Sequence, residues 1–317
     1  MQGMISAGGP KTAAAGAAIL KQGGNAVDAA VAAAFVSFIA EIGVVHLGGS
    51  GIAHIYNPES GNSLVYDFFS DMPGKGGKKP AHIDFEQVTI DFGATTQSFF
   101  LGRASVAVPG NIAGLCQMAA DYGRLPLSTL LQPAIDMARA GVAIHPFQAA
   151  TCKLLTPLYT HTASMRAIFQ KGSEVIAPGD HLFIPDLAET LTALATHGAD
   201  YARTGPLAQA IVADQQANGG LLTAQDLAEY EVRQVASIRL PYREYELLLP
   251  PPSSTGGVLT AFTLKLLSHF DVAALAHGSA AHMQLLYEVM AATNRARPQW
   301  DHDSEHLPLH EAIDQFL

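Results

Sequence analysis

The chain has 317 residues and a mass of 33.3 kDa, long enough to bury a large core in one domain or two. Its 18 Lys and Arg residues and 28 Asp and Glu residues give a net charge of −10, with no basic stripe, which argues against nucleic-acid binding. Hydrophobic residues make up 49% and charged residues only 15%, so we expect a second chain to cover an apolar face. The two cysteines, Cys116 and Cys152, have neither zinc-site nor disulfide-framework spacing.

The first residues do not read as a signal peptide, because Met1 to Gly3 lead directly into a short apolar segment. The apolar run between Asp28 and Glu41 is well short of the roughly 20 residues that cross a bilayer. We therefore expect a cytoplasmic chain that makes no contact with membranes.

The first predicted elements are a strand at residues 4–7 and a helix at residues 10–21, which begins at Pro10 and is closed by two glycines. Asn25 is a good N-cap for the next helix, and Asp28 stands three residues on, as in a capping box. Because Ser37 is its only polar residue between positions 29 and 40, this helix is expected to be buried on all sides.

The loop at residues 48–51, with the sequence Gly-Gly-Ser-Gly, leaves backbone N–H groups without side-chain cover. Such a loop lets the chain run close to a ligand and can cradle a carboxylate or an oxyanion. A tight connection between the helix and the following strand explains the loop equally well.

Strands at residues 52–56 and 63–69 are expected to form a hairpin, followed by an exposed excursion at residues 70–95. Pro133 is expected to divide one helical region into two pieces. We expect further helices at 111–122, 127–131, 133–140, 146–155, 163–170, 185–196, 206–218, 258–268 and 280–295, a short one opened by Thr223 and Asp226, and strands at 105–108, 235–240 and 244–249. With no internal repeat and no low-complexity linker, the chain is interpreted as a single domain over residues 1–317.

Two segments near the C-terminus could bind a ligand, but each also has a purely structural explanation. His302, His306 and His310 would align on a helix as a metal site, although Pro308 interrupts that helix and a flexible polar tail is the alternative. Residues 250–257, Pro-Pro-Pro-Ser-Ser-Thr-Gly-Gly, place hydroxyl and N–H groups before a helix, where they suit either an anion or a rigid capped turn.

Several segments in order along the chain resemble the gamma-glutamyltransferase (gamma-glutamyltranspeptidase) family. The strongest is QGGNAVDAAVAAAF at residues 22–35. The others are SVAVPGNIAGLCQMAADYGRLPLSTLLQPAIDMARAG at 105–141, GDHLFIPDLAETL at 179–191, GPLAQAIVADQQANGGLLTAQDLAEYEV at 205–232 and LPPPSSTGG at 249–257. Each segment alone is weak, but their order and spacing cover most of the chain.

The resemblance implies an N-terminal-nucleophile hydrolase, made as a precursor that cuts itself before a threonine. In that family the threonine begins the small subunit, and its own α-amino group serves as the base for its hydroxyl. The implied fold is α+β: this chain is the large-subunit part of a four-layer α-β-β-α sandwich that the small subunit completes. The catalytic nucleophile is then expected as the residue after Leu317, the autoprocessing boundary, and this chain carries no catalytic residue of its own.

The implied partners are the small subunit from the same precursor and a small amide substrate, in a role linked to glutathione metabolism. A higher oligomer of such heterodimers is compatible with the resemblance. No metal or other cofactor is expected. The sequence leaves open the acyl donor, the acceptor, and whether the acyl group passes to water or to an amine.

The chain departs from the family at the substrate-binding segment. The family pattern Asp-Phe-Arg-Glu-x-x-Pro supplies an arginine for the α-carboxylate of a gamma-glutamyl group, a task that suits a bidentate guanidinium. Here Phe69 stands at the arginine position, followed by Ser70 and Asp71, and Lys75 is the nearest cation along the chain. We expect Phe69, Ser70, Asp71 and the loop residue Ser50 to contact the substrate. Altered acyl specificity follows, or else a family member without turnover that acts as a binding or scaffold protein.

Overall fold

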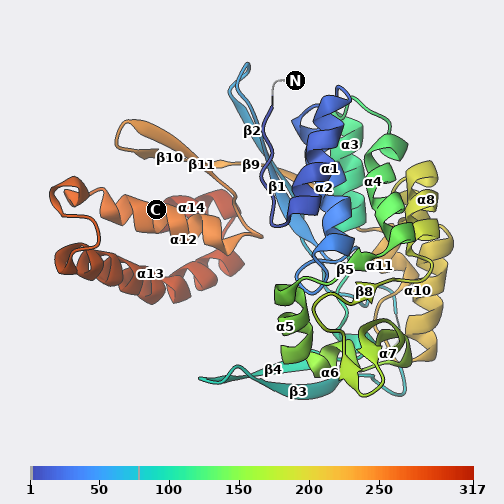
Figure 1. The fold of residues 1–317 in the computed structure, drawn as a ribbon. Helices are drawn as coiled ribbons and strands as arrows, with labels where there is room; N and C mark the ends of the chain where they lie inside the picture. Colours follow the sequence, from blue (N-terminus) through green and yellow to red (C-terminus); the bar gives the residue numbers. More distant parts are fainter. Residues whose placement is uncertain (1–2, 78) are drawn as a thin grey trace. The chain divides into compact units, whose positions relative to one another are not determined.

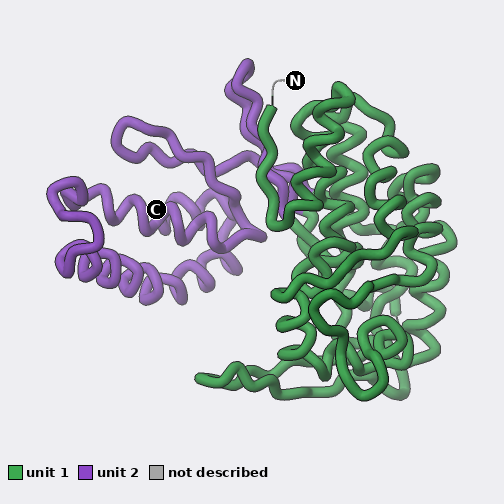
Figure 2. The backbone as a smooth tube through the Cα atoms, viewed as in Figure 1, with its two compact units in different colours: residues 1–51, 68–232 green, residues 52–67, 233–317 purple. Residues whose placement is uncertain are grey.

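The computed structural model describes residues 3–77 and 79–317 (Figure 1). Its contacts divide the chain into two compact units, coloured separately in Figure 2. Unit 1 comprises Met1–Gly51 and Phe68–Val232, and unit 2 comprises Ile52–Asp67 and Arg233–Leu317. The single domain expected over residues 1–317 stays a prediction, and each unit is described below by itself.

Unit 1 is mainly helical, with three short two-stranded sheets. Its elements are α1 (Pro10–Lys21), α2 (Ala26–Ala40), β3 (Glu86–Asp91), β4 (Thr96–Leu101), η1 (Arg103–Ser105), α3 (Asn111–Tyr122), α4 (Leu127–Ala140), β5 (Val142–Ala143), α5 (Pro146–Leu154), α6 (Thr156–Tyr159), α7 (Ala163–Phe169), β6 (Gln170–Lys171), β7 (Glu174–Val175), β8 (His181–Leu182), α8 (Leu187–His197), α9 (Asp200–Arg203), α10 (Pro206–Ala217) and α11 (Ala224–Ala228).

Unit 2 contains the sheet β1-β2-β9, the sheet β10-β11 and three α-helices. Its elements are β1 (Gly51–Asn57), β2 (Asn62–Phe68), β9 (Arg233–Ala236), β10 (Ile238–Tyr242), β11 (Tyr245–Leu249), α12 (Thr255–Leu267), η2 (Val272–Ala274), α13 (Ala280–His306) and α14 (Leu309–Phe316). Gly51 and Phe68, at the ends of β1 and β2, belong to unit 1. The mixture of helices with antiparallel sheets agrees with the predicted α+β class.

Helix α2 forms the centre of unit 1, where it packs against α1, α3 and α4 (Figure 1). The Asn25 side chain accepts a hydrogen bond from the Asp28 N–H, and Asp28 accepts one from the Asn25 N–H, so the predicted capping box is confirmed. Between Ala29 and Ala40 only Ala30 is exposed and all other residues are buried or half-buried, close to the expectation of a helix buried on all sides. Asp28 is fully buried, and its carboxylate also accepts from the Arg124 N–H at 3.0 Å, which ties α2 to the α3–α4 turn.

The structure of unit 1 differs from the sequence interpretation in three respects. Helix α4 runs unbroken through Pro133, because burial of Leu130, Leu131 and Ala134 outweighs one lost backbone hydrogen bond. Strand β3 lies inside the expected excursion of residues 70–95 and pairs with β4. The expected strands at residues 4–7 and 105–108 are wrong: the first is irregular, and the second retains only a bridge at Val108.

Unit 2 corrects the interpretation of the C-terminal half. The expected strand at residues 235–240 is divided at Ser237: β9 pairs with β2, whereas β10 pairs with β11. The expected polar tail at residues 298–317 is helical, since α13 continues through Pro298 and α14 follows. Trp300, Ala312 and Phe316 from this segment join Ile238 and Val258 in the core of unit 2. Within the described residues, no helix is both long enough and apolar enough to cross a membrane.

We predict that Asp28→Ala lowers the free energy of unfolding by about 3 kcal/mol, because the N–H groups of residues 25 and 124 lose their buried acceptor. The matched control is Asp136→Ala, which removes an exposed carboxylate bonded to Gln132 and is expected to change stability by less than about 0.5 kcal/mol. Denaturant unfolding measures both, and equal effects would contradict the assignment.

Candidate active site

The glycine loop is bound to the start of α3 by backbone hydrogen bonds within unit 1. The Gly49 carbonyl accepts from the N–H groups of Gly110 and Asn111, both at 3.0 Å. The His46 carbonyl accepts from the Gly49 N–H at 3.0 Å and from Asn111 Nδ2 at 2.9 Å. Asn111 is buried and its side-chain amide holds the loop, while Gly110 takes the N-cap position of α3.

The segment at residues 69–71 is held through its backbone carbonyl groups. The Val108 N–H donates to the Asp71 carbonyl at 2.9 Å, and the Tyr230 hydroxyl donates to the Phe69 carbonyl at 2.8 Å. Phe68 points into unit 1 and is only 5% exposed, whereas Phe69 is 48% exposed. A Cβ at Gly110 would overlap the Phe68 carbonyl and the Tyr230 hydroxyl, so this position requires glycine.

A cavity of about 510 Å³ lies between the glycine loop, Ser70 and the segment before α3. Its lining residues are Val44, Val45, His46, Gly48, Gly49, Ser50, Ser70, Ser105, Val106, Ala107 and Asn111. Hydroxyl groups and a glycine-rich backbone therefore meet in one hollow, and they suit a polar ligand that exchanges hydrogen bonds. Of the predicted contacts, the structure brings Ser50 and Ser70 together here, while Phe69 is turned outward and Asp71 is half-buried beside them.

His46, Ser105 and Asn111 line the cavity although the sequence interpretation gave them no substrate role. Desolvation by neighbouring atoms lowers the pKa of His46, even though the residue as a whole is exposed, so its imidazole is neutral at neutral pH. A neutral imidazole both donates and accepts hydrogen bonds. The positions of two of these residues in the sequence could have indicated that they line the cavity. His46 closely precedes the glycine loop, and Asn111 directly follows Pro-Gly at a helix start.

Asp226 positions the segment that follows Asp71. Its carboxylate accepts from the N–H groups of Gly74 at 2.8 Å, Lys75 at 2.9 Å and Thr223 at 2.8 Å, and from Thr223 Oγ1 at 2.9 Å. The expected helix start at Thr223 and Asp226 is confirmed as a capping box. Burial raises the pKa of the Asp226 carboxyl, but these hydrogen bonds lower it by more, so the net pKa shift is downward.

In unit 2, the serines before α12 bind a carboxylate of the protein itself. Asp67 is 2% exposed and accepts from Ser253 Oγ at 2.8 Å and from the Ser253 N–H at 3.2 Å. Arg233 Nη2 lies 3.1 Å from the same carboxylate. The donors in residues 250–257 that were considered for an anion are therefore used in part by Asp67.

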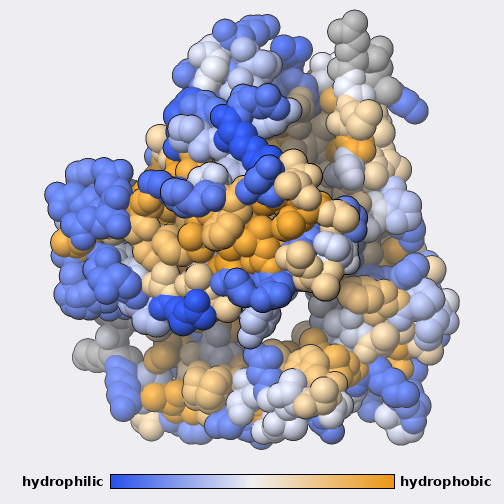
Figure 3. Space-filling model, turned by 90° about the vertical axis from the view of Figure 1, so that its left-hand side faces the viewer, coloured by the Kyte–Doolittle hydropathy of each residue, from blue (hydrophilic) through white to orange (hydrophobic). Residues whose placement is uncertain are grey.

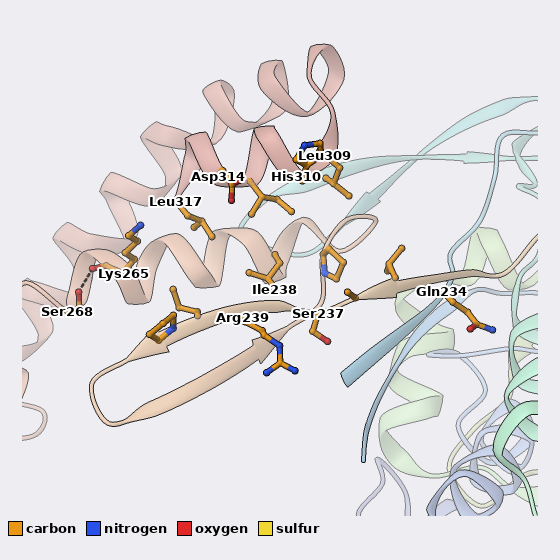
Figure 4. Close-up of a pocket in the computed structure, with 16 residues that line it drawn as sticks. Gln234, Ser237, Ile238, Arg239, Lys265, Ser268, Leu309, His310, Asp314 and Leu317 are labelled. Carbon is orange, nitrogen blue, oxygen red and sulfur yellow. Dashed lines mark hydrogen bonds between the residues drawn. The ribbon is translucent and has the colours of Figure 1, made fainter. Parts of the chain in front are cut away.

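Leu317 lies at an apolar cavity of about 1000 Å³ in unit 2, with Leu309 and Ile238 also in its lining (Figure 4). The three histidines considered as a metal site are divided by Pro308, because His302 and His306 end α13 and His310 lies in α14. The rings of His302 and His306 stack with centroids 4.3 Å apart. No group of three or more metal-ligating side chains occurs in the part of the chain that the structure describes.

Comparison with known proteins defines the class of this fold. The structure of Helicobacter pylori gamma-glutamyltranspeptidase superposes with a TM-score of 0.85 at 29% identity, covering 98% of this chain and 88% of that one. The acylase ACY 1 proenzyme of Pseudomonas sp. (strain V22) is 33% identical over 99% of this chain and 56% of its own length. The glutathione hydrolase proenzyme of Escherichia coli (strain K12) is 32% identical over 90% of this chain and 48% of its own length.

The fold is that of the N-terminal-nucleophile hydrolases, which confirms the expected fold class. The sequence model of gamma-glutamyltranspeptidase matches residues 12–317, and the chain belongs to that family. It spans about half the length of these curated relatives.

We predict that Gly110→Ala destabilises the protein by about 1–3 kcal/mol, because the added Cβ displaces the Phe68 carbonyl and with it the Ser70 side of the cavity. Gly256→Ala is the control, since a Cβ there makes only an ordinary contact with Ser254 Oγ, at 3.8 Å, within helix α12 and is neutral or stabilising. Thermal unfolding measures both variants. A Gly110→Ala variant as stable as the parent would contradict the close contact.

We also predict that Asp226 contributes to the acid sensitivity of the protein. Its folded-state pKa lies below the ordinary value of 3.8, so its stabilisation is fully present above that value and is lost as pH falls through the folded-state pKa. Asp226→Asn should lower stability near pH 7 and reduce its fall between about pH 5 and about pH 2. Unfolding free energies measured across this range test the prediction, with Asp136→Asn as the exposed control; an unchanged slope in Asp226→Asn would refute it.

Proposed function

We propose that this chain is the large subunit of an autoprocessed gamma-glutamyltransferase-like amidohydrolase or acyltransferase. Family membership supports an enzyme of the hydrolase and transferase type. The similar acylase and glutathione hydrolase carry the name proenzyme, and this chain spans about half their length. In this proposal a cut after Leu317 releases a small subunit that begins with the nucleophilic threonine.

The reaction proceeds through an acyl-enzyme. The threonine hydroxyl, deprotonated by the threonine's own α-amino group, attacks the amide carbonyl, and the amine leaves. Water or an acceptor amine then releases the acyl group. The residues of this chain bind and orient the substrate: Ser50, Ser70 and neutral His46 offer hydrogen bonds around the cavity, and Asn111 holds the glycine loop in place.

Exposed apolar side chains in unit 2 support a partner chain. On α13, Met283, Tyr287 and Met290 recur at helical spacing and are 56%, 73% and 60% exposed. Figure 3 shows a broad apolar band on one face of the molecule. Apolar surface of this extent is typical of a protein–protein interface, as the low charged fraction of the chain also indicates.

The preferred acyl group is one without an α-carboxylate. This specificity is inferred from Phe69, whose exposed ring stands where the family has its carboxylate-binding arginine. The nearest cation along the chain, Lys75, is already paired with Glu229 at 3.7 Å. Met72 and Val106 are also exposed near this part of the chain, at 85% and 42%, and favour an apolar acyl group over a charged one.

The same substitution favours a second function, in which the protein binds without turnover as a scaffold. Loss of the arginine removes the main recognition of a gamma-glutamyl group, and no structural feature requires that another acyl group replace it. Turnover of amide donors by the processed protein separates the two functions: any acyl anilide hydrolysed well above the uncatalysed rate excludes the scaffold.

We predict slow hydrolysis of gamma-glutamyl anilides and faster hydrolysis of anilides with an apolar acyl group. Phe69→Arg should raise kcat/KM for the gamma-glutamyl donor about 10-fold or more, because a charge-assisted hydrogen bond contributes about 1.5–3 kcal/mol. Phe270→Arg is the matched control, as Phe270 is 45% exposed and belongs to unit 2. Brisk gamma-glutamyl turnover by the parent protein would exclude the altered specificity.

A further inference from the structure

One histidine and two serines meet side by side on the sheet β1-β2-β9 of unit 2. His54 Nε2 lies 2.6 Å from Ser63 Oγ, and Ser63 Oγ lies 2.6 Å from Ser237 Oγ. Ser237 Oγ in turn lies 2.8 Å from His54 Nε2. Ser63 and Ser237 adjoin the cross-strand pair Leu64↔Ala236, so the antiparallel register itself places the two hydroxyls together.

Partial desolvation lowers the pKa of His54, which keeps the imidazole neutral at neutral pH. We assign its proton to Nδ1, so that two hydroxyl protons serve the three contacts and Nε2 accepts without donating. Ser63 is assigned as the donor to Nε2 because its Oγ lies closer, at 2.6 Å against 2.8 Å for Ser237 Oγ, and Ser237 then donates to the oxygen of Ser63. Ser63 is then the central hydroxyl, with a base on one side and a hydrogen-bond donor on the other.

The cluster is open to reagents from solution. His54 is exposed, and Ser63 and Ser237 are half-buried. Figure 4 shows Ser237 and Arg239 on the side of the strand away from α12, and both also belong to the lining of the cavity at Leu317. Arg239 is bonded to Glu246 at 2.6 Å and to the Gly61 carbonyl at 3.0 Å, and we assign neither charged residue a part in the chemistry.

We propose that Ser63 is a nucleophile activated by His54, and that it accepts an acyl group from aryl esters independently of the cavity at the glycine loop. Ser63 Oγ forms a bond to the ester carbonyl carbon, and its proton passes to His54 Nε2. The bond between that carbon and the aryloxy oxygen then breaks, and the leaving phenolate takes the proton from His54. The products are O-acyl-Ser63 and a phenol, with His54 returned to its neutral form.

The Ser237 hydroxyl positions Ser63: its hydrogen bond to the Ser63 oxygen leaves the Ser63 proton directed at His54 Nε2, while the negative charge of the attack develops on the ester carbonyl oxygen. An exposed serine without a neighbouring imidazole provides the comparison. Ser98, on β4, accepts a hydrogen bond from Gln87 Nε2 at 2.9 Å and is exposed, but it has no base in contact. The two serines differ in exposure and in the contact of Ser63 with Ser237 as well as in the presence of His54, so the His54→Gln variant isolates the effect of the base.

The test is site-resolved acetylation of the processed protein by 4-nitrophenyl acetate, followed by peptide mapping with mass spectrometry. A positioned general base typically contributes about 10²–10⁴-fold, so we expect Ser63 to be acetylated about 100-fold faster than Ser98. His54→Gln keeps a hydrogen-bonding side chain but removes the base, and should reduce the rate at Ser63 to that of Ser98. Ser237→Ala should leave an intermediate rate.

Three results would overturn the proposal. Ser63 acetylated no faster than Ser98 excludes an activated nucleophile. An unchanged rate at Ser63 in His54→Gln excludes the base. Acetylation of Ser237 in place of Ser63 excludes the assigned order. Because each serine is measured in its own peptide, the outcome does not depend on whether the protein hydrolyses amides, and Tm values of the variants report whether they fold.

Discussion

The close approach between Phe68 and the start of α3 is the contact on which the candidate site depends. The Phe68 carbonyl and ring lie where a Cβ of Gly110 or Gly114 would be, so only glycine admits them. The Gly49 carbonyl accepts two N–H groups from the same helix start. Three segments that are distant in sequence therefore converge within unit 1, and the cavity between them has walls held by backbone hydrogen bonds.

The backbone around residue 69 is held by contacts to its main-chain atoms. Phe68, the last residue of β2, is buried, whereas Phe69, the first residue after the strand, is 48% exposed. The position of Phe69 is fixed through its carbonyl, which the Tyr230 hydroxyl binds, and through the next residues, which Val108 and Asp226 hold. These contacts hold the backbone through main-chain atoms, and our proposal assigns acyl recognition to the side chain at residue 69.

The sequence predicted elements whose signals are local. The capping box of α2 and its apolar run lie within a few residues of each other, and the structure confirms both. Pro133 was judged by a local rule that the burial of Leu130 and Leu131 overrides. The segment after Pro298 looked polar because Trp300 and Phe316 are widely spaced, yet they form the core of unit 2. Such packing is decided by residues far along the chain, which no local pattern contains.

For the candidate site too, the sequence predicted residues that lie in local motifs and missed those brought together from distant positions. Ser50 and Ser70 were expected from their place in family motifs, and they line one cavity. Asn111 and His46 were missed as lining residues because their contact joins positions 65 residues apart. The cluster of His54 and Ser237 joins positions 183 residues apart and depends on strand register, which the sequence interpretation assigned differently.

The central claim is that this chain works as one of two subunits, with the reactive threonine on the other. Intact-mass measurement of the full-length gene product, with N-terminal sequencing of any smaller fragment, tests it most directly. The account predicts two fragments, the larger ending at Leu317 and the smaller beginning with threonine. A single uncut chain, or a smaller fragment that begins with a residue lacking a nucleophilic side chain, would contradict it.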